Sequence, residues 1–194
     1  MNDVMKKAIV FTFCIFTVFI MQAQSLYDRI TATNKDGENN YVYVLSSKDS
    51  LRIAKDKIDG RECLKIGPWQ YSASNIDESL SHEVYFNAKE KKKILLINKR
   101  EEVSLGMDVF VIENGKISFL GFMPVAAYTK ENSERMDYNS ILPYVSIVKI
   151  SNRLVFSFET PLVVLYPLGD LEEILDGRNV FYTYSDGVME LNKN

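Results

Sequence analysis

The chain has only one histidine and two cysteines among its 194 residues, and this scarcity excludes several common catalytic sites. A Ser-His-Asp site would have to be built around His82, and the Gly-x-Ser-x-Gly turn that presents a nucleophilic serine does not occur. Gly-x-Gly, the centre of many phosphate-binding loops, is absent too. We therefore expect no catalytic residue, no cofactor-binding residue and no cofactor.

The N-terminal apolar run is too short to span a membrane comfortably, but its surroundings are those of a secretory signal peptide. Lys6 and Lys7 precede an uncharged apolar run of 14 residues (8–21), whereas a spanning helix needs about 20. Ala23 supplies a small residue for cleavage. We expect residues 1–23 to be removed and the mature chain, which begins at Gln24, to be periplasmic or extracellular, with no stable membrane span.

Export leaves Cys63 as the only cysteine, because Cys14 lies inside the leader. No intrachain disulfide can form, and zinc, which prefers Cys and His, would find one of each. A Cys63–His82 nucleophile pair lacks a glycine-rich turn around Cys63. We interpret the two residues as a half-buried cysteine and a histidine at the start of a strand, and we expect no metal ligands.

Carboxylates are plentiful but do not form a recognisable site. The oxygen-rich segments 34–40 and 56–60 lack the spacing of an EF-hand and are typical of turns. The adjacent acids Glu101-Glu102 and Glu172-Glu173 point in different directions on a strand or a short helix. The basic run 89–93 has no interleaved aromatic residues, so we interpret it as a solvated loop.

The charge balance also excludes some partners. The whole chain has a formal charge of −3, and loss of Lys6, Lys7 and Asp3 makes the mature chain one unit more negative. An acidic chain is a poor candidate for binding nucleic acid or an anionic membrane surface. No Asn-x-Ser/Thr sequence occurs, which favours a bacterial origin.

The mature sequence is a series of short apolar runs rich in Val, Ile, Phe and Tyr, the composition of β-strands. The runs are 41–45, 51–54, 63–66, 83–86, 94–97, 107–112, 117–125, 145–150, 154–158, 162–166, 180–184 and 188–191. Residues 94–97 and 162–166 are apolar on both faces, which predicts central strands covered on both sides.

Turn residues between these runs predict hairpins. Asn114-Gly115 accepts the positive φ angles of a type I′ turn and would place Glu113 opposite Lys116. Ser185-Asp186-Gly187 and Ser151-Asn152-Arg153 predict two more hairpins. Strands joined so tightly must be antiparallel.

These patterns predict one β-rich domain over residues 41–194, after a polar lead-in at 24–40. The fold class is an antiparallel β-sandwich or a partly open β-barrel with one or two short helices, at 170–176 and 74–80. Residues 129–140 would be a polar connection, with at most one helical turn.

The function expected from these features is that of a non-enzymatic exported binding protein. Its partner would be a small apolar ligand, which a barrel can enclose, or a protein of the cell envelope. Trp69 and Tyr71, beside a Gly-Pro turn, are the candidate contact residues, although a tryptophan that plugs a β core is the simpler interpretation. The alternatives are an envelope hydrolase that uses Asp, Glu and Tyr groups, and an assembly component that pairs through a strand edge.

Overall fold

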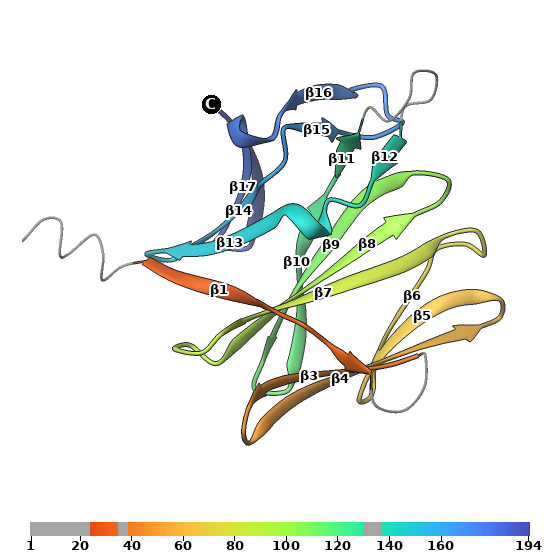
Figure 1. The fold of residues 1–194 in the computed structure, drawn as a ribbon, viewed down its shortest axis with the longest axis vertical. Helices are drawn as coiled ribbons and strands as arrows, with labels where there is room; N and C mark the ends of the chain where they lie inside the picture. Colours follow the sequence, from red (N-terminus) through yellow and green to blue (C-terminus); the bar gives the residue numbers. More distant parts are fainter. Residues whose placement is uncertain (1–23, 35–38, 130–136) are drawn as a thin grey trace, which may run out of the picture.

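The protein is built almost entirely from β-strands (Figure 1). The computed structural model describes residues 24–34, 39–129 and 137–194. Within them the strands form three sheets, and the only helical elements are two short 3-10 turns, η1 (Leu142–Tyr144) and η2 (Gly177–Asn179). The prediction of a mainly β, antiparallel sandwich or partly open barrel is confirmed. The predicted leader and its predicted cleavage after Ala23 lie outside the described residues.

The largest sheet has nine antiparallel strands and curls into a nearly closed barrel. Its edge strands, β10 and β18, contact each other, and a methyl group on Gly121 would lie 2.8 Å from Cβ of Met189. In spatial order the strands are β10 (Lys116–Met123), β9 (Ser104–Glu113), β8 (Lys92–Arg100), β7 (Ser79–Asn87), β1 (Gln24–Ile30), β13 (Val145–Ile150), β14 (Arg153–Phe158), β17 (Val180–Ser185) and β18 (Val188–Lys193).

Two smaller sheets cover parts of this barrel (Figure 1). The five-stranded sheet packs on the outer face of β7, β8 and β9, and the four-stranded sheet contributes β11 and β15 to the core inside the barrel. The first contains β2 (Thr33–Asn34), β3 (Asn40–Ser46), β4 (Asp49–Ile58), β5 (Arg61–Ile66) and β6 (Trp69–Ser72). The second contains β12 (Asp137–Asn139), β11 (Val125–Thr129), β15 (Leu162–Leu165) and β16 (Glu173–Asp176).

Strand β8 belongs to both hydrophobic cores. Ile94 and Leu96 face the inside of the barrel, whereas Leu95 and Ile97 face the five-stranded sheet, and all four are fully buried. Alternate residues of a strand point to opposite faces, so a run of four apolar residues needs cover on both sides. The prediction of a covered central strand at 94–97 is confirmed.

The predicted hairpins are also confirmed. Asn114 and Gly115 have φ angles of 51° and 75°, and Glu113 lies opposite Lys116. Glu113 forms its ion pair with Lys92, whose Nζ lies 3.4 Å from Oε1. The turns at 186–187 and 151–152 join β17 to β18 and β13 to β14.

The stretch interpreted as a lead-in, residues 24–40, contains β1, the strand that joins β7 to β13 at the centre of the large sheet. Its apolar pattern is weak because one face is covered only at the end of the strand. Tyr27 is buried in the barrel core, while on the other face Leu26 is 57 % exposed and Ile30 packs on the second core. Residues 35–38 lie outside the described part.

Both predicted short helices are wrong. Residues 173–176 form strand β16 beside β15, and Leu171, assigned to the buried helix face, is 73 % exposed. In 74–80 the Asn75 side chain accepts hydrogen bonds from the backbone N–H groups of Asp77 (3.0 Å) and Glu78 (2.9 Å). Such side-chain bonds compete with helix formation, and two helical turns alone are marginally stable. Of the connection at 129–140, residues 130–136 lie outside the described part.

Candidate ligand-binding cavity at the barrel mouth

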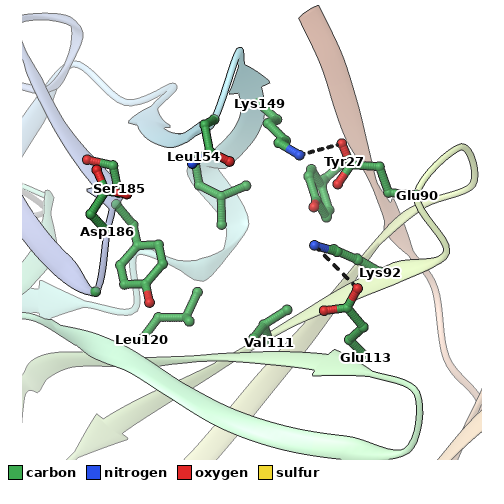
Figure 2. A pocket seen from close by; sticks show the side chains of 13 residues that line it. Tyr27, Glu90, Lys92, Val111, Glu113, Leu120, Lys149, Leu154, Ser185 and Asp186 are labelled. Carbon is green, nitrogen blue, oxygen red and sulfur yellow. Dashed lines mark hydrogen bonds and ion pairs between the residues drawn. The ribbon is translucent and has the colours of Figure 1, made fainter.

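Four hairpin turns of the large sheet converge at one end of the barrel. The strand registers bring together the turns at 88–91, 114–115, 151–152 and 186–187 and the start of β1. A cavity of about 350 Å³ lies at this end, which we call the mouth (Figure 2). Barrel mouths are common ligand sites, because the sheet supplies rigid walls and the turns supply polar groups.

Apolar and aromatic side chains on the inner face of the barrel form the floor of the cavity. They come from five strands, namely Tyr27 (β1), Val111 (β9), Leu120 (β10), Leu154 (β14) and Tyr184 (β17). Beneath this layer the interior is occupied by buried side chains such as Leu96, Ile147 and Phe156. A ligand would therefore lie at the mouth.

Two lysine–glutamate pairs stand above this floor. Lys149 Nζ lies 2.7 Å from Glu90 Oε1, and Lys92 Nζ lies 3.4 Å from Glu113 Oε1. Figure 2 shows Tyr27 between the two pairs. The cavity thus combines an apolar floor with charges that are already paired within the protein.

Glu90 is held in place by a neighbouring amide. The side chain of Asn87, which is 1 % exposed, accepts a hydrogen bond from the Glu90 backbone N–H (2.9 Å) and donates one to the Leu26 carbonyl (3.1 Å). Asn87 therefore ties the β7–β8 turn to β1. The second carboxylate oxygen of Glu90, Oε2, is buried and has no hydrogen-bond partner among the described residues.

Tyr27 offers a hydroxyl group that stays protonated. Burial, followed by the negative charges of Glu90 and Glu113, raises the pKa of Tyr27 to about 12. Within the described part of the chain this hydroxyl forms no hydrogen bond. At neutral pH it is therefore a hydrogen-bond donor and acceptor for a ligand, and it does not supply a phenolate nucleophile.

The sequence contained a signal for this cavity that pattern analysis missed. The inward-facing residues of β8, β9 and β13 change from apolar to charged next to the mouth. Lys92, Glu113 and Lys149 follow Ile94, Val111 and Ile147 on the same faces. Glu90 and Lys92 belong to the basic run interpreted as a solvated loop, and they line the cavity instead. Recognising this pattern requires knowing which face points inward.

Trp69 and Tyr71 lie on β6, away from the mouth. Their rings stack on each other with centroids 6.1 Å apart, and both pack edge-to-face on Phe110, at 5.2 and 5.6 Å. The Tyr71 hydroxyl donates a hydrogen bond to Asp108. These contacts place both rings against the core beneath the five-stranded sheet. The neighbouring Phe119 is 57 % exposed, and a partner contact at Trp69 and Tyr71 stays a prediction.

Cys63 and His82 do not form a pair in the structure. Cys63 is fully buried on β5 and points away from the core that holds its neighbour Leu64. His82 lies on β7, with its ring 4.8 Å from that of Tyr41. Its Nε2 is buried without a hydrogen-bond partner in the described chain, and burial lowers its pKa to about 4.

The oxygen-rich segments form turns and ion pairs. Asp56 contacts Lys65 at 2.7 Å, and Asp59-Gly60 is a hairpin turn with φ angles of 51° and 81°. Over residues 24–34, 39–129 and 137–194, no group of three or more His, Cys, Asp or Glu side chains is arranged to hold a metal ion. Nor does the described part of the chain include a helix long and apolar enough to cross a membrane.

No protein-family description, curated protein or solved structure matches the chain.

Proposed function

We propose that this protein is an exported, non-enzymatic binding protein that holds a small molecule in the mouth of its barrel. The observation that carries the proposal is the 350 Å³ cavity, which combines an apolar floor with the Tyr27 hydroxyl and two lysine–glutamate pairs. Ligand cavities of proteins are typically about 300–1,000 Å³, so this one suits a small ligand. The leader sequence supports export.

The polar groups of the cavity favour binding over catalysis. Each glutamate carboxylate is paired with a lysine, and Tyr27 stays protonated at neutral pH. A nucleophile needs an adjacent base or a lowered pKa, and the cavity lining contains neither histidine nor cysteine. The groups can orient a ligand by hydrogen bonds and charge.

The test uses two variants of adjacent residues on β14. Leu154 faces the cavity and Val155 faces outward, so Leu154→Trp fills the mouth while Val155→Trp is the matched control. A small-molecule fragment library is screened against ¹⁵N-labelled protein. We expect fragments to shift the amide resonances of cavity residues in the parent and in Val155→Trp, and not in Leu154→Trp. Shifts confined to another surface, or no shifts, would overturn the proposal.

The second candidate function is an envelope hydrolase, because Glu90 and Glu113 line one cavity and glycosidases use two carboxylates. It predicts that the protein cleaves glycosides and that Glu90→Gln lowers the rate by at least about a hundredfold. Chromogenic glycosides, with the exposed Glu190→Gln as control, separate the two functions. Binding without turnover supports the binding protein.

Export is tested by intact mass spectrometry of the protein recovered from the periplasm or medium of a bacterial host. The expected mass is that of a chain beginning at Gln24. A full-length chain in the membrane fraction would show that residues 8–21 act as an anchor.

A further inference from the structure

The charges of the residues that line the cavity do not cancel. Three carboxylates line the cavity, from Glu90, Glu113 and Asp186, against two ammonium groups, from Lys92 and Lys149. Each lysine forms an ion pair with one glutamate. The N–O distance is 2.7 Å for Lys149 and Glu90 and 3.4 Å for Lys92 and Glu113. One negative charge therefore remains over, and Asp186, on the exposed β17–β18 turn, forms no ion pair with a described residue.

One acceptor in this cavity lacks a donor. Glu90 Oε1 accepts a hydrogen bond from the Lys149 ammonium group. Glu90 Oε2 is buried without a hydrogen-bond partner in the described structure. A buried carboxylate oxygen without a donor is costly, since it loses its water and gains nothing in return. A ligand N–H group would satisfy it. Asn87 holds the Glu90 backbone at the cavity wall, so a small turn of the Glu90 side chain would bring this buried oxygen to a ligand.

An aromatic ring stands beside these two glutamates. Tyr27 lies between the two ion pairs (Figure 2). Tyr184 contributes a second ring to the lining. The face of an aromatic ring attracts a cation, and the attraction grows where water is partly excluded. Below the rings, Val111, Leu120 and Leu154 provide apolar contact for a hydrocarbon body.

We propose that the mouth selects small amphipathic organic cations, in which an ammonium group meets Glu90 and Tyr27 and an apolar body rests on Val111, Leu120 and Leu154. This inference rests on the proposed binding function and names its ligand class. Lys149 and Lys92 are each paired with a glutamate, and Asp186 supplies the negative charge of the lining that neither lysine matches.

The test compares three probes with the same hydrocarbon chain: hexylammonium, hexan-1-ol and hexanoate. Calorimetry and amide resonance shifts measure their binding to the mature protein at neutral pH. We expect hexylammonium to bind at least about fivefold more tightly than hexan-1-ol, and hexanoate to bind most weakly. Added salt should weaken hexylammonium binding and leave hexan-1-ol binding unchanged.

Charge-removing variants locate the effect. Glu90→Gln should lower hexylammonium affinity by at least about fivefold without changing hexan-1-ol affinity. Asp186→Asn is the second charge-removing variant and should also weaken hexylammonium binding. It keeps the turn, because Asn also accepts the φ angle of 52° found at this position. Glu190→Gln, which removes the same charge from an exposed residue of β18 outside the cavity, is the control and should change nothing.

The outcomes separate this inference from the function on which it rests. Tightest binding of hexanoate, or equal binding of all three probes at a site blocked by Leu154→Trp, would overturn the cation preference and retain the binding function. Failure of hexylammonium to bind at the mouth at millimolar concentration would overturn the inference as well. If no fragment in the library binds there either, the binding function itself fails.

Discussion

His82 is a neutral histidine in a place where protonation is costly. Its ring packs against Tyr41 and Tyr43 between β7 and β3, and Lys55 adds a positive charge nearby. Burial, followed by this charge, lowers the pKa to about 4 from an ordinary value of 6.5. The folded protein therefore binds a proton at this site less readily than the unfolded chain.

Acid should accordingly weaken the fold through His82. The stability that its neutral form contributes is fully present above about pH 6.5 and is lost as the pH falls towards about 4. Between about pH 7 and pH 5, where most carboxylates remain ionised, we expect the free energy of unfolding to fall by about 2 kcal/mol. Urea titrations of the parent and His82→Phe measure it, and the variant should lose this pH dependence. Equal slopes for both proteins would refute the prediction.

Gly115 tests the backbone of the β9–β10 turn. Its φ angle is 75°, and no atom lies within 4 Å of the place that a Cβ atom would take, so a substitution is opposed by the backbone conformation alone. Gly115→Val should lower the free energy of unfolding by about 1–3 kcal/mol, since a β-branched residue resists positive φ. Lys116→Ala should lower the free energy of unfolding by only a few tenths of a kcal/mol, roughly the contribution of a weak exposed charge interaction. Thermal melts compare the two, and equal shifts would contradict the role of the turn.

At the scale of elements, the contact between β10 and β18 decides how far the barrel closes. Both are edge strands of the nine-stranded sheet, and a bulge between Phe119 and Gly121 interrupts the register of β10. Gly121 leaves room for Met189 of β18 to approach. Without a side chain at this position, the two edges pack together although they are not paired in the sheet.

Gly121→Ala should therefore lower the free energy of unfolding by more than the backbone strain of an alanine at positive φ would lower it alone. The new methyl group would lie 2.8 Å from Met189 Cβ, and overpacking of this kind costs about 1–3 kcal/mol. Gly187→Ala is the control, because Gly187 also has a positive φ, of 85°, but nothing lies within 4 Å. Chemical denaturation measures both variants. Equal losses would mean that β18 moves away from β10 at no cost.

At the scale of the whole molecule, two cores share one set of strands. The barrel interior and the core beneath the five-stranded sheet lie on opposite faces of β7, β8 and β9. Loss of either core would expose one face of the same central strands. The two layers should therefore unfold together.

Leu95→Ala and Leu96→Ala test this coupling, because the two adjacent residues face different cores. Each should lower the free energy of unfolding by about 2–5 kcal/mol, the usual cost of such a cavity. The single tryptophan, Trp69, reports on the five-stranded sheet, and far-ultraviolet circular dichroism reports on all strands. In the parent and both variants the two signals should change at the same temperature. Separate transitions would show that the layers fold independently.

The sequence by itself determined the features that depend on neighbouring residues. The apolar runs of β8 and β9, and the turns at Asn114-Gly115 and Asp186-Gly187, follow from side-chain shape and backbone preference within a few positions. The absence of a second histidine equally limited the chemistry in advance.

The tertiary structure alone decided the features that depend on distant strands. β1 has a weak pattern of its own and becomes the central strand because β7 and β13 offer it hydrogen bonds on both sides. Residues 173–176 form a strand because β15 offers them hydrogen bonds, although their local pattern favours a helix. The cavity depends on register and barrel closure, which turn Lys92, Glu113 and Lys149 inward at one end. Strand pairing sets these directions over long separations in the chain, so no local pattern contains them.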